Sequence, residues 1–324
     1  MKKMNNKITL LLASLLLALA CGCSSIPAAT YMDTPAVSET TVQPEPSQEA
    51  SQPVQADESS DGLTVTIAGQ TISIPAYSGQ PYTAVNGNVP LFTEADMTTE
   101  AFESYSDLDA LGRCGTAYAC VGTETMPTEE RGDISRVKPS GWQSVKYDNV
   151  DGGYLYNRCH LIGFQLTAEN ANERNLITGT RYLNIDGMLP FENMVADYIK
   201  ETDNHVLYRV TPVFIGDDLV ASGVVMEGKS VEDDGDGILY CVYCYNVQPG
   251  IVIDYATGDS SIAEVSTDDT SSAQDYILNT NSKKFHLPSC SSAADISPSN
   301  REEYHCNRQE LIDQGYEPCR RCNP

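Results

Sequence analysis

The sequence is poor in basic residues and, beyond Ala20, in long apolar runs. Only 20 Lys and Arg residues stand against 45 Asp and Glu residues, so the formal net charge is −25 at pH 7 and does not favour polyanion binding. With 41% hydrophobic and 20% charged residues, the composition is globular, which excludes a wholly disordered chain and a polytopic membrane protein. Eleven cysteines in 324 residues are too few for a small disulfide scaffold. The length allows about two domains plus tails.

The amino terminus has the pattern of a secretory signal. A basic segment at 1–7 precedes an apolar run at 8–20 that is too short to span a bilayer comfortably. Small residues then lead to Cys21 and Cys23, which resembles the lipobox of bacterial lipoproteins. Residues 1–23 therefore predict export, with lipidation at Cys21 or Cys23 and Cys21 favoured. A doubly acylated cysteine would anchor the protein stably to a membrane, whereas simple cleavage would release it.

Composition divides the rest of the chain into two folded units. Residues 24–62 are rich in Ser, Thr, Pro, Gln and Glu, with almost no bulky apolar residues, and are expected to form a disordered linker. A second acidic, Ser- and Thr-rich segment at 258–275 separates the middle of the chain from a cysteine-containing tail. The folded units are thus expected at 63–257 and 276–324.

Hydrophobic periodicity in the first unit indicates strands and one amphipathic helix. Apolar residues alternate on both sides of Ala68-Gly69, which predicts a hairpin over 63–74. Alternating runs recur at 205–216, 219–228 and 238–247. A helix opening at Pro190 would carry an apolar stripe formed by Phe191, Met194, Val195, Tyr198 and Ile199. The expected fold class is α+β, with a mostly antiparallel sheet.

Polar side chains are concentrated between residues 152 and 193. They alternate with short apolar runs and comprise Arg158, His160, Asn170, Asn172, Arg174, Asn175, Arg181, Asn184 and Glu192. One histidine is most often an ordinary surface or core residue. Its position among arginines, amides and a carboxylate makes His160 a candidate catalytic residue.

This segment resembles the DNA/RNA non-specific endonucleases of the ββα-metal (His-Me finger) superfamily. Their hallmark is a strand ending in Asp-Arg-Gly-His, and Asn157-Arg158-Cys159-His160 occupies that place here. The likeness is greatest to the branch of secreted and cell-surface DNA-entry nucleases and covers about 105–255, including MPTEERGDISRVKPSGW upstream. Asn157 and Cys159 depart from the family pattern. The resemblance implies a ββα-metal motif and phosphodiester hydrolysis leaving 5′-phosphates.

Phosphodiester hydrolysis needs a base for water and a cation for the charge that builds on phosphoryl oxygens. Neutral imidazole suits the base, so His160 is the predicted general base. The resemblance implies that Asn184 is the direct protein ligand of Mg²⁺ or Mn²⁺ and that Glu192 holds metal-bound waters. Asn184 is equally suited to cap a helix beginning at 185, and this alternative stays open.

Three arginines are candidates for contacting phosphate, namely Arg158, Arg131 and Arg174. A guanidinium fork matches phosphate oxygens better than an ammonium group does. Neighbouring glutamates offer the alternative of surface ion pairs for Arg131 and Arg174. Trp142 is the only tryptophan and could stack on a base, although core or rim packing is the commoner role of one aromatic residue.

Charge is distributed unevenly along the chain. Between residues 131 and 181 the basic residues are Arg131, Arg136, Lys138, Lys146, Arg158, Arg174 and Arg181, against Asp133, Asp148, Asp151, Glu169 and Glu173. This distribution predicts one cationic groove that binds DNA, and RNA as a further candidate, mainly through the backbone and with little sequence preference. No segment indicates an obligate protein partner.

The tail contains two metal-binding pairs, His286-x3-Cys290 and Cys319-x2-Cys322. Their spacing fits a tetrahedral Zn²⁺ site. It resembles the N-terminal zinc module of Ada-type DNA repair proteins, with His286 where that module has a cysteine. Disulfide bonding that includes Cys306 is the alternative in an exported protein.

Two further pairs of cysteines are close enough in the sequence to be considered for disulfide bonds. A bond between Cys114 and Cys120 is compatible with the sequence, whereas Cys241 and Cys244 point to opposite strand faces and would form a strained bond.

The leading hypothesis for the function is a surface-tethered endonuclease. A non-catalytic or weakly catalytic surface DNA receptor is the alternative, and a zinc-capturing lipoprotein would leave residues 152–193 without a role.

Overall fold

A computed structural model describes residues 54–59, 62–263 and 273–324 of the chain. The predicted signal, Cys21, Cys23 and most of the first linker lie outside these residues. Among the residues that are described, no helix has both the length and the apolar character needed to cross a membrane.

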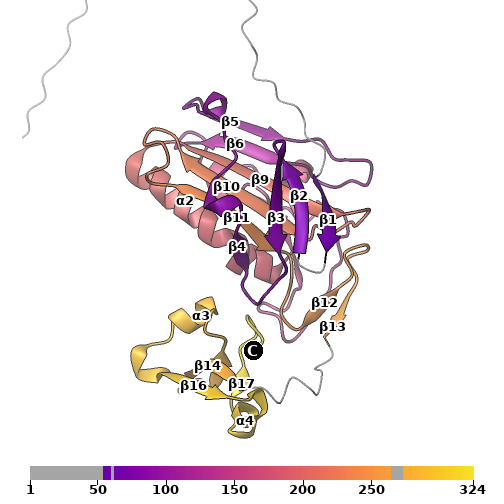
Figure 1. Cartoon of the computed structure of the whole chain (residues 1–324), viewed down its shortest axis with the longest axis vertical. Helices are drawn as coiled ribbons and strands as arrows, with labels where there is room; N and C mark the ends of the chain where they lie inside the picture. The colour runs from indigo at the N-terminus through magenta and orange to yellow at the C-terminus, as the bar shows by residue number, and fades with distance from the viewer. Residues whose placement is uncertain (1–53, 60–61, 264–272) are drawn as a thin grey trace, which may run out of the picture. The chain divides into compact units, whose positions relative to one another are not determined.

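A nine-stranded, mostly antiparallel sheet forms the centre of the first unit (Figure 1). Its strands are β1 (Val54–Ser59), β2 (Gly62–Ile67), β3 (Gln70–Pro75), β4 (Tyr82–Ala84), β5 (Phe102–Tyr105), β6 (Ala117–Val121), β9 (Val206–Ile215), β10 (Gly223–Ser230) and β11 (Leu239–Tyr245). The order is β3-β2-β1-β9-β10-β11-β4, with β6 also pairing with β9 and β5 with β6. Only the β1–β9 pair in this sheet is parallel. The predicted class and the strands read from alternation are confirmed.

The hairpin turn between β2 and β3 has a simple local cause. Ala68 and Gly69 have φ angles of 49° and 75°, the left-handed conformations of a two-residue turn that matches strand twist. Their strands place Val65, Ile72 and Ile74 in an apolar cluster on one face of the sheet. The predicted hairpin over 63–74 is therefore present.

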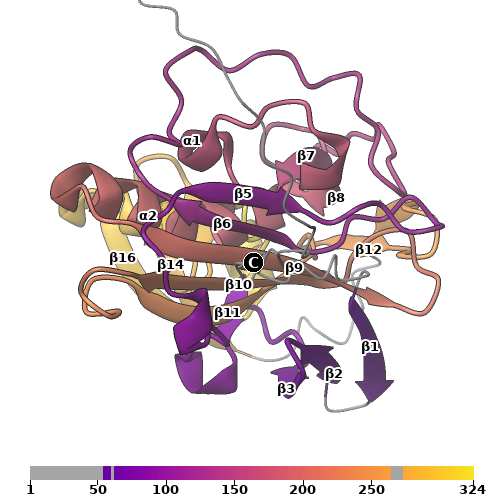
Figure 2. The ribbon, with the colours of Figure 1, turned by 90° about the horizontal axis from the view of Figure 1, so that it is seen from above.

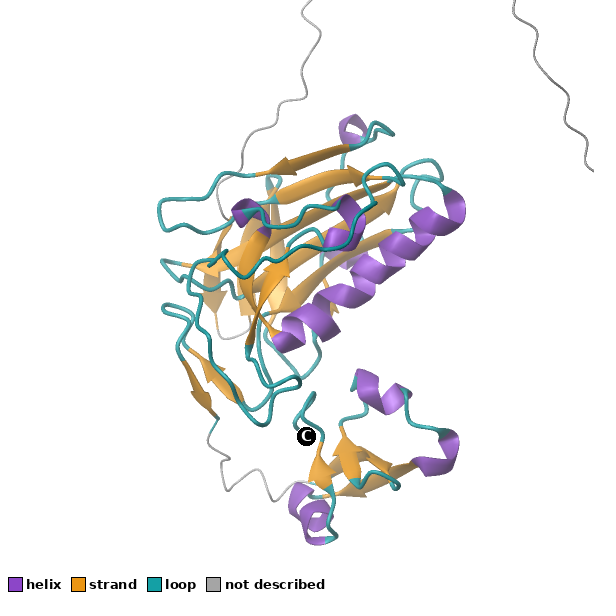
Figure 3. Ribbon diagram, turned by 180° about the vertical axis from the view of Figure 1, so that it is seen from behind, coloured by secondary structure: helices purple, strands orange, loops and turns teal. Residues whose placement is uncertain are grey.

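Helix α2 (Leu189–Thr202) packs on the opposite face (Figure 3). Pro190 lies in its first turn, where the missing N–H costs nothing. Phe191, Val195 and Ile199 are buried against the sheet as predicted, whereas Met194 is exposed. The stripe is narrower than expected because Met194 lies on the solvent side of the helix.

Several smaller elements lie on the same side of the sheet as α2. Figure 2 shows β7, β8 and α1 on this side and β2 and β3 on the opposite side. The smaller elements are β7 (Tyr156–His160), β8 (Leu176–Thr180), α1 (Phe164–Thr167), η3 (Glu173–Asn175) and the π-helix η4 (Leu183–Met188). The remaining elements of this unit are η1 (Asn86–Asn88), η2 (Glu94–Asp96), β12 (Ile251–Ile253) and β13 (Ser260–Ile262). Strands β7 and β8 form a separate antiparallel pair.

The carboxyl-terminal unit has its own four-stranded sheet in the order β16-β14-β15-β17. Its elements are β14 (Gln274–Asn279), β15 (Lys284–His286), α3 (Ser291–Ala294), η5 (Pro298–Asn300), β16 (Arg301–Cys306), α4 (Arg308–Asp313) and β17 (Glu317–Pro318). Two small apolar clusters hold it, one around Phe285 and Leu311 and one around Ile277 and Ala293. So small a core is typical of modules that need an additional cross-link.

A strand lies inside each of the two segments that composition predicted to be linkers. Strand β1 begins at Val54, inside 24–62, because β9 offers a free edge with which it pairs in parallel. Strand β13 likewise lies inside 258–275 and pairs with β12. Polar composition missed these strands because pairing with a neighbouring strand, and not burial, holds most of their residues.

Candidate active site

Strand β7 and the loop after it position His160. His160 is the last residue of β7 and pairs with Leu176 of β8. The loop is closed by Asn175, which is fully buried and whose amide both accepts from the Ile162 N–H (2.9 Å) and donates to the Ile162 carbonyl (3.0 Å). The sequence alone does not distinguish Asn175 from the other polar residues of this segment. The structure shows that it ties the two ends of the β7–β8 connection together.

The two ring nitrogens of His160 have different partners. Nε2 lies 2.8 Å from the Asn170 carbonyl oxygen, and because a carbonyl only accepts, Nε2 carries the proton. Nδ1 therefore carries the lone pair, which accepts a hydrogen bond from a guanidinium nitrogen of Arg131 at 3.2 Å. Burial lowers the pKa of His160 to about 4, with the Asn170 hydrogen bond opposing this shift and the Arg131 charge adding to it. The imidazole is thus neutral near pH 7.

Asn184 lies in the π-helix η4, and not at a helix N-cap. This position excludes the capping alternative. Its Oδ1 accepts from the Cys159 thiol at 3.2 Å, and its Nδ2 donates to Asn157 Oδ1 at 3.4 Å. Burial raises the pKa of Cys159, so the thiol keeps its proton and can donate.

Glu192 follows two turns after Asn184 and lines the same cleft. Its carboxylate approaches Gly163 so closely that a Cβ there would lie 2.6 Å from Oε2. Burial raises the pKa of Glu192 to about 7, against the lowering effects of a Gln165 hydrogen bond and the Arg131 charge. A bound cation would stabilise the charged form of a carboxylate that is desolvated in this way.

A cleft of about 1120 Å³ brings most of the predicted site residues together. His160, Arg131, Arg158, Asn184 and Glu192 all line it, and the structure adds two cations to its wall, Lys138 and Arg181. Basic residues of the segment 131–181 thus line the cleft together with Asp151, and DNA binding there stays a prediction. The amide and carboxylate oxygens of Asn184 and Glu192 are the donors that a hard divalent cation prefers.

Arg158 has a different environment from the one its place in the motif suggested. Its guanidinium donates to the carbonyls of Val137 and Ser135, the latter at 2.7 Å, and stacks 4.0 Å from the centre of the Trp142 ring. These contacts hold the 135–142 loop at the rim of the cleft. Trp142 accordingly has one face covered and packs in an apolar cluster, which matches the rim role weighed above.

Arg174 is the one predicted arginine that does not line the cleft. It is exposed on η3 and pairs with Asp107 at 3.2 Å. Sequence reasoning also missed Tyr154, an aromatic residue that is 48% exposed at the cleft. The signal for it was weak, because one tyrosine after Gly152-Gly153 is indistinguishable from a turn residue.

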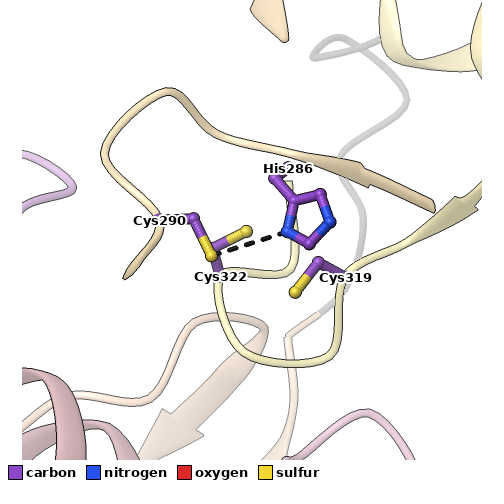
Figure 4. A group of neighbouring side chains, drawn as sticks. All are labelled: His286, Cys290, Cys319 and Cys322. Carbon is purple, nitrogen blue, oxygen red and sulfur yellow. Dashed lines mark hydrogen bonds between the residues drawn. The ribbon is translucent and has the colours of Figure 1, made fainter. Parts of the chain in front are cut away.

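The carboxyl-terminal unit gathers the four predicted zinc ligands. In Figure 4, His286, Cys290, Cys319 and Cys322 face a common centre, and their donor atoms lie within 4.8 Å of one another. Zn–S bonds of about 2.3 Å in a tetrahedron require sulfur atoms about 3.8 Å apart, so the cluster fits Zn²⁺. Backbone N–H groups of Leu287 and Arg321 donate to two of the sulfurs, each at 3.4 Å.

The disulfide alternatives do not match the structure. Each of the nine cysteines within the described residues is a free thiol. Cys306 packs in a different apolar cluster from the other three cysteines of the tail. Cys114 donates to the carbonyls of Glu173 and Leu176 instead of bonding to Cys120.

Comparisons with known proteins agree with this geometry. The family model for DNA/RNA non-specific endonucleases matches residues 93–232. NucA from Streptococcus agalactiae with a magnesium ion bound is similar in structure at 25% identity and a TM-score of 0.51, over 58% of this chain and 88% of that one. NucA from the same organism with no metal bound is similar at 24% identity and a TM-score of 0.52, over 61% and 92%. Over residues 93–232 the chain therefore carries a domain that matches the DNA/RNA non-specific endonuclease family.

Proposed function

We propose that the chain is a metal-dependent endonuclease that hydrolyses phosphodiester bonds of DNA with little sequence preference. RNA is a further candidate substrate. One observation carries the proposal: a buried, neutral His160 with an oriented tautomer shares a cleft with Asn184, Glu192 and Arg131. General-base hydrolysis of a phosphodiester needs this combination of groups.

His160 is the proposed base. The Asn170 carbonyl fixes the Nε2–H, so the lone pair lies on Nδ1. Arg131 donates to this lone pair in the absence of substrate and would turn to the phosphate, so that Nδ1 removes a proton from water as its oxygen attacks phosphorus. The P–O3′ bond then breaks with its electron pair going to O3′, which takes a proton from solvent water, leaving a 5′-phosphate and a 3′-hydroxyl. When His160 becomes charged, the same carbonyl stabilises the imidazolium by continuing to accept from Nε2.

Asn184 and Glu192 would hold a divalent ion, Mg²⁺ or Mn²⁺, with Glu192 acting through water. The ion would supply charge stabilisation for the phosphoryl oxygens and the leaving oxygen. Magnesium is favoured because the donors are oxygens and because the similar NucA structure was solved with that ion. Arg131 lines the cleft beside His160 and is the proposed phosphate-binding arginine. Arg158 is assigned to holding the rim of the cleft, and Arg174 is given no role in the reaction.

The proposed setting is the outside of a bacterial cell. The secretory pattern at 1–23 supports export, and a lipid on Cys21 or Cys23 would tether the enzyme to a membrane. The tail is proposed to be a structural Zn²⁺ module of the Ada type, because its small core gains a cross-link from the four clustered ligands.

The test of the proposed function uses residues 24–324 with plasmid DNA and with a structured RNA. Mg²⁺ is expected to support cutting, and removal of free Mg²⁺ with EDTA to abolish it by depriving the cleft of its ion. Quantified gels measure both substrates. If the protein retains DNA on a filter but does not cut it with either Mg²⁺ or Mn²⁺, the result would contradict the endonuclease and favour the hypothesis of a surface DNA receptor.

Arg131 gives a prediction about pH dependence. Its charge lowers the pKa of His160, and a general base works only above its pKa, so activity should fall as pH decreases through that value. Arg131→Gln is expected to raise the His160 pKa and to move the acidic limb of kcat/KM to higher pH, with a rate loss of roughly 10- to 100-fold from weaker phosphate contact.

Two variants control this measurement. Arg131→Lys keeps the charge and should leave the acidic limb near its native position. Arg136→Gln removes an exposed charge from the same loop, outside the cleft lining, and should change neither limb nor rate. An unshifted limb in Arg131→Gln would contradict the charge coupling between Arg131 and His160.

A further inference from the structure

A chain of hydrogen bonds fixes the orientation of the Asn184 amide, the proposed metal ligand. An asparagine amide can rotate by 180° and exchange its oxygen and nitrogen, so its orientation must be inferred from its partners. The partners of Asn184 are themselves oriented by a series of groups that reaches the rim of the cleft. That series begins at an ion pair between Arg181 and Asp151, 3.3 Å apart.

Arg181 sets the first orientation. It donates to the side chain of Asn157 at 3.4 Å, and because a guanidinium has no acceptor, the atom facing it must be the oxygen of Asn157. The same Asn157 oxygen lies 3.4 Å from Asn184. The Asn184 atom that faces an acceptor must be its NH₂ group, so the Asn184 oxygen points to the other side.

Cys159 occupies that other side. Its Sγ lies 3.2 Å from Asn184 Oδ1, where the S–H group donates to a good acceptor, whereas sulfur would offer an NH₂ group only a weak one. The thiol therefore favours the same orientation that Asn157 imposes from the opposite end. A carbonyl oxygen has two lone pairs, so the thiol takes one and leaves the other for a cation.

Packing keeps the thiol in place. Cys159 is fully buried, and Gly179 on the neighbouring strand β8 has no side chain. A Cβ at Gly179 would overlap the Sγ atom of Cys159. The absence of a side chain at Gly179 thus provides the space for the thiol under Asn184, and the two residues are matched in size.

We propose that Cys159 is a positioning residue whose thiol, together with Asn157, holds the Asn184 amide with its oxygen available to a divalent cation. This inference rests on the proposed function, since it takes Asn184 as the metal ligand. It gives Asn157 and Cys159, the two departures from the family motif, one common role in orienting Asn184. Asn157 supplies the acceptor that the usual Asp would supply, and Cys159 adds a donor that the usual Gly lacks.

The experiment measures Mn²⁺ binding to zinc-loaded residues 24–324 without nucleic acid, by the EPR signal of free Mn²⁺. Cys159→Ala removes the donor and is expected to weaken Mn²⁺ binding by roughly 10-fold, the lower end for loss of a group that orients a ligand. Cys159→Ser keeps a donor of similar size and should stay within about threefold of the native protein. The Mg²⁺ concentration for half-maximal cleavage should rise by the same factor in Cys159→Ala, with kcat at saturating Mg²⁺ nearly native.

A second variant separates the hydrogen bond from the packing. Cys159→Gly/Gly179→Ala places a methyl group near the position of the thiol without a donor, and is expected to bind Mn²⁺ as weakly as Cys159→Ala does. Thermal unfolding without Mn²⁺ checks that each variant is folded. Native affinity for Mn²⁺ in folded Cys159→Ala, or a loss in Cys159→Ser equal to that in Cys159→Ala, would overturn the positioning role.

Failure of the proposed function gives a different result. In that case the native protein does not cut with any divalent ion, or Asn184→Ala binds Mn²⁺ as tightly as the native protein does. The second outcome also overturns the inference, because Asn184 would not be the ligand. If the native protein cuts and Asn184→Ala loses Mn²⁺, the three variants at Cys159 test the inference alone.

Discussion

Replacing His160 with alanine is expected to lower kcat for plasmid cleavage by at least about 100-fold, the scale of a lost general base. Binding of DNA should change by less than about threefold, because the basic residues of the cleft wall remain. The measurements are initial rates at saturating Mg²⁺ and DNA binding in EDTA. Together they separate the chemical step from substrate affinity.

His205 provides the matched control. It is a second histidine of the same unit, and its ring nitrogens contact Glu232 at 2.6 Å and Glu124 at 3.0 Å, outside the cleft lining. His205→Ala should cut DNA at a rate close to the native one. If His160→Ala cut as fast as His205→Ala, His160 would not be the base.

The native pH profile should agree with this role. With the pKa of His160 lowered to about 4, the base stays neutral at every pH well above that value. The kcat/KM value is therefore expected to be insensitive to His160 from neutral pH down to about pH 5, and to fall tenfold per unit once the imidazole is protonated. An acidic limb centred near pH 6.5 would mean that His160 is solvated like a model imidazole.

Replacing Cys319 with serine is expected to have the second largest effect, on the carboxyl-terminal unit. A structural zinc ion contributes its binding energy to folding, and this unit has only two small apolar clusters to hold it otherwise. Zinc content should fall from stoichiometric to near zero, and residues 276–324 should become sensitive to protease. Metal analysis of reduced protein and limited proteolysis measure these two results.

Cys306→Ser is the control for zinc. Cys306 is buried in the same unit but is absent from the four-residue ligand cluster, so this variant should keep its zinc. Plasmid cleavage by Cys319→Ser should remain within about threefold of native, since the cleft residues all belong to the first unit. Stoichiometric zinc in Cys319→Ser would show that the cluster is not the zinc site.

Local patterns in the sequence predicted the hairpin, three further strands and the long helix of the first unit, but not the strand order of its sheet. The hairpin at Ala68-Gly69 and the helix after Pro190 follow from turn geometry and from periodicity, and both depend on residues close together in the chain. The family resemblance grouped His160, Asn184 and Glu192, which line one cleft, and the spacing of the two metal-binding pairs predicted the cluster of four ligands. Within each metal-binding pair the two ligands are close in the chain, so local geometry brings them together, whereas the meeting of the two pairs depends on the fold of the whole unit.

Only the tertiary structure decided what the arginines and the amides do. The sequence makes both Arg158 and Arg131 candidates for contacting phosphate. In the structure the carbonyls of Ser135 and Val137 accept from Arg158, while Arg131 contacts His160. The tautomer of His160 depends on the Asn170 carbonyl, and Cys159 reaches Asn184 through space left by Gly179. Long side chains and backbone carbonyls form hydrogen bonds with residues that are distant in the chain. The orientation of these hydrogen bonds therefore depends on the tertiary structure, and residue spacing in the sequence does not determine it.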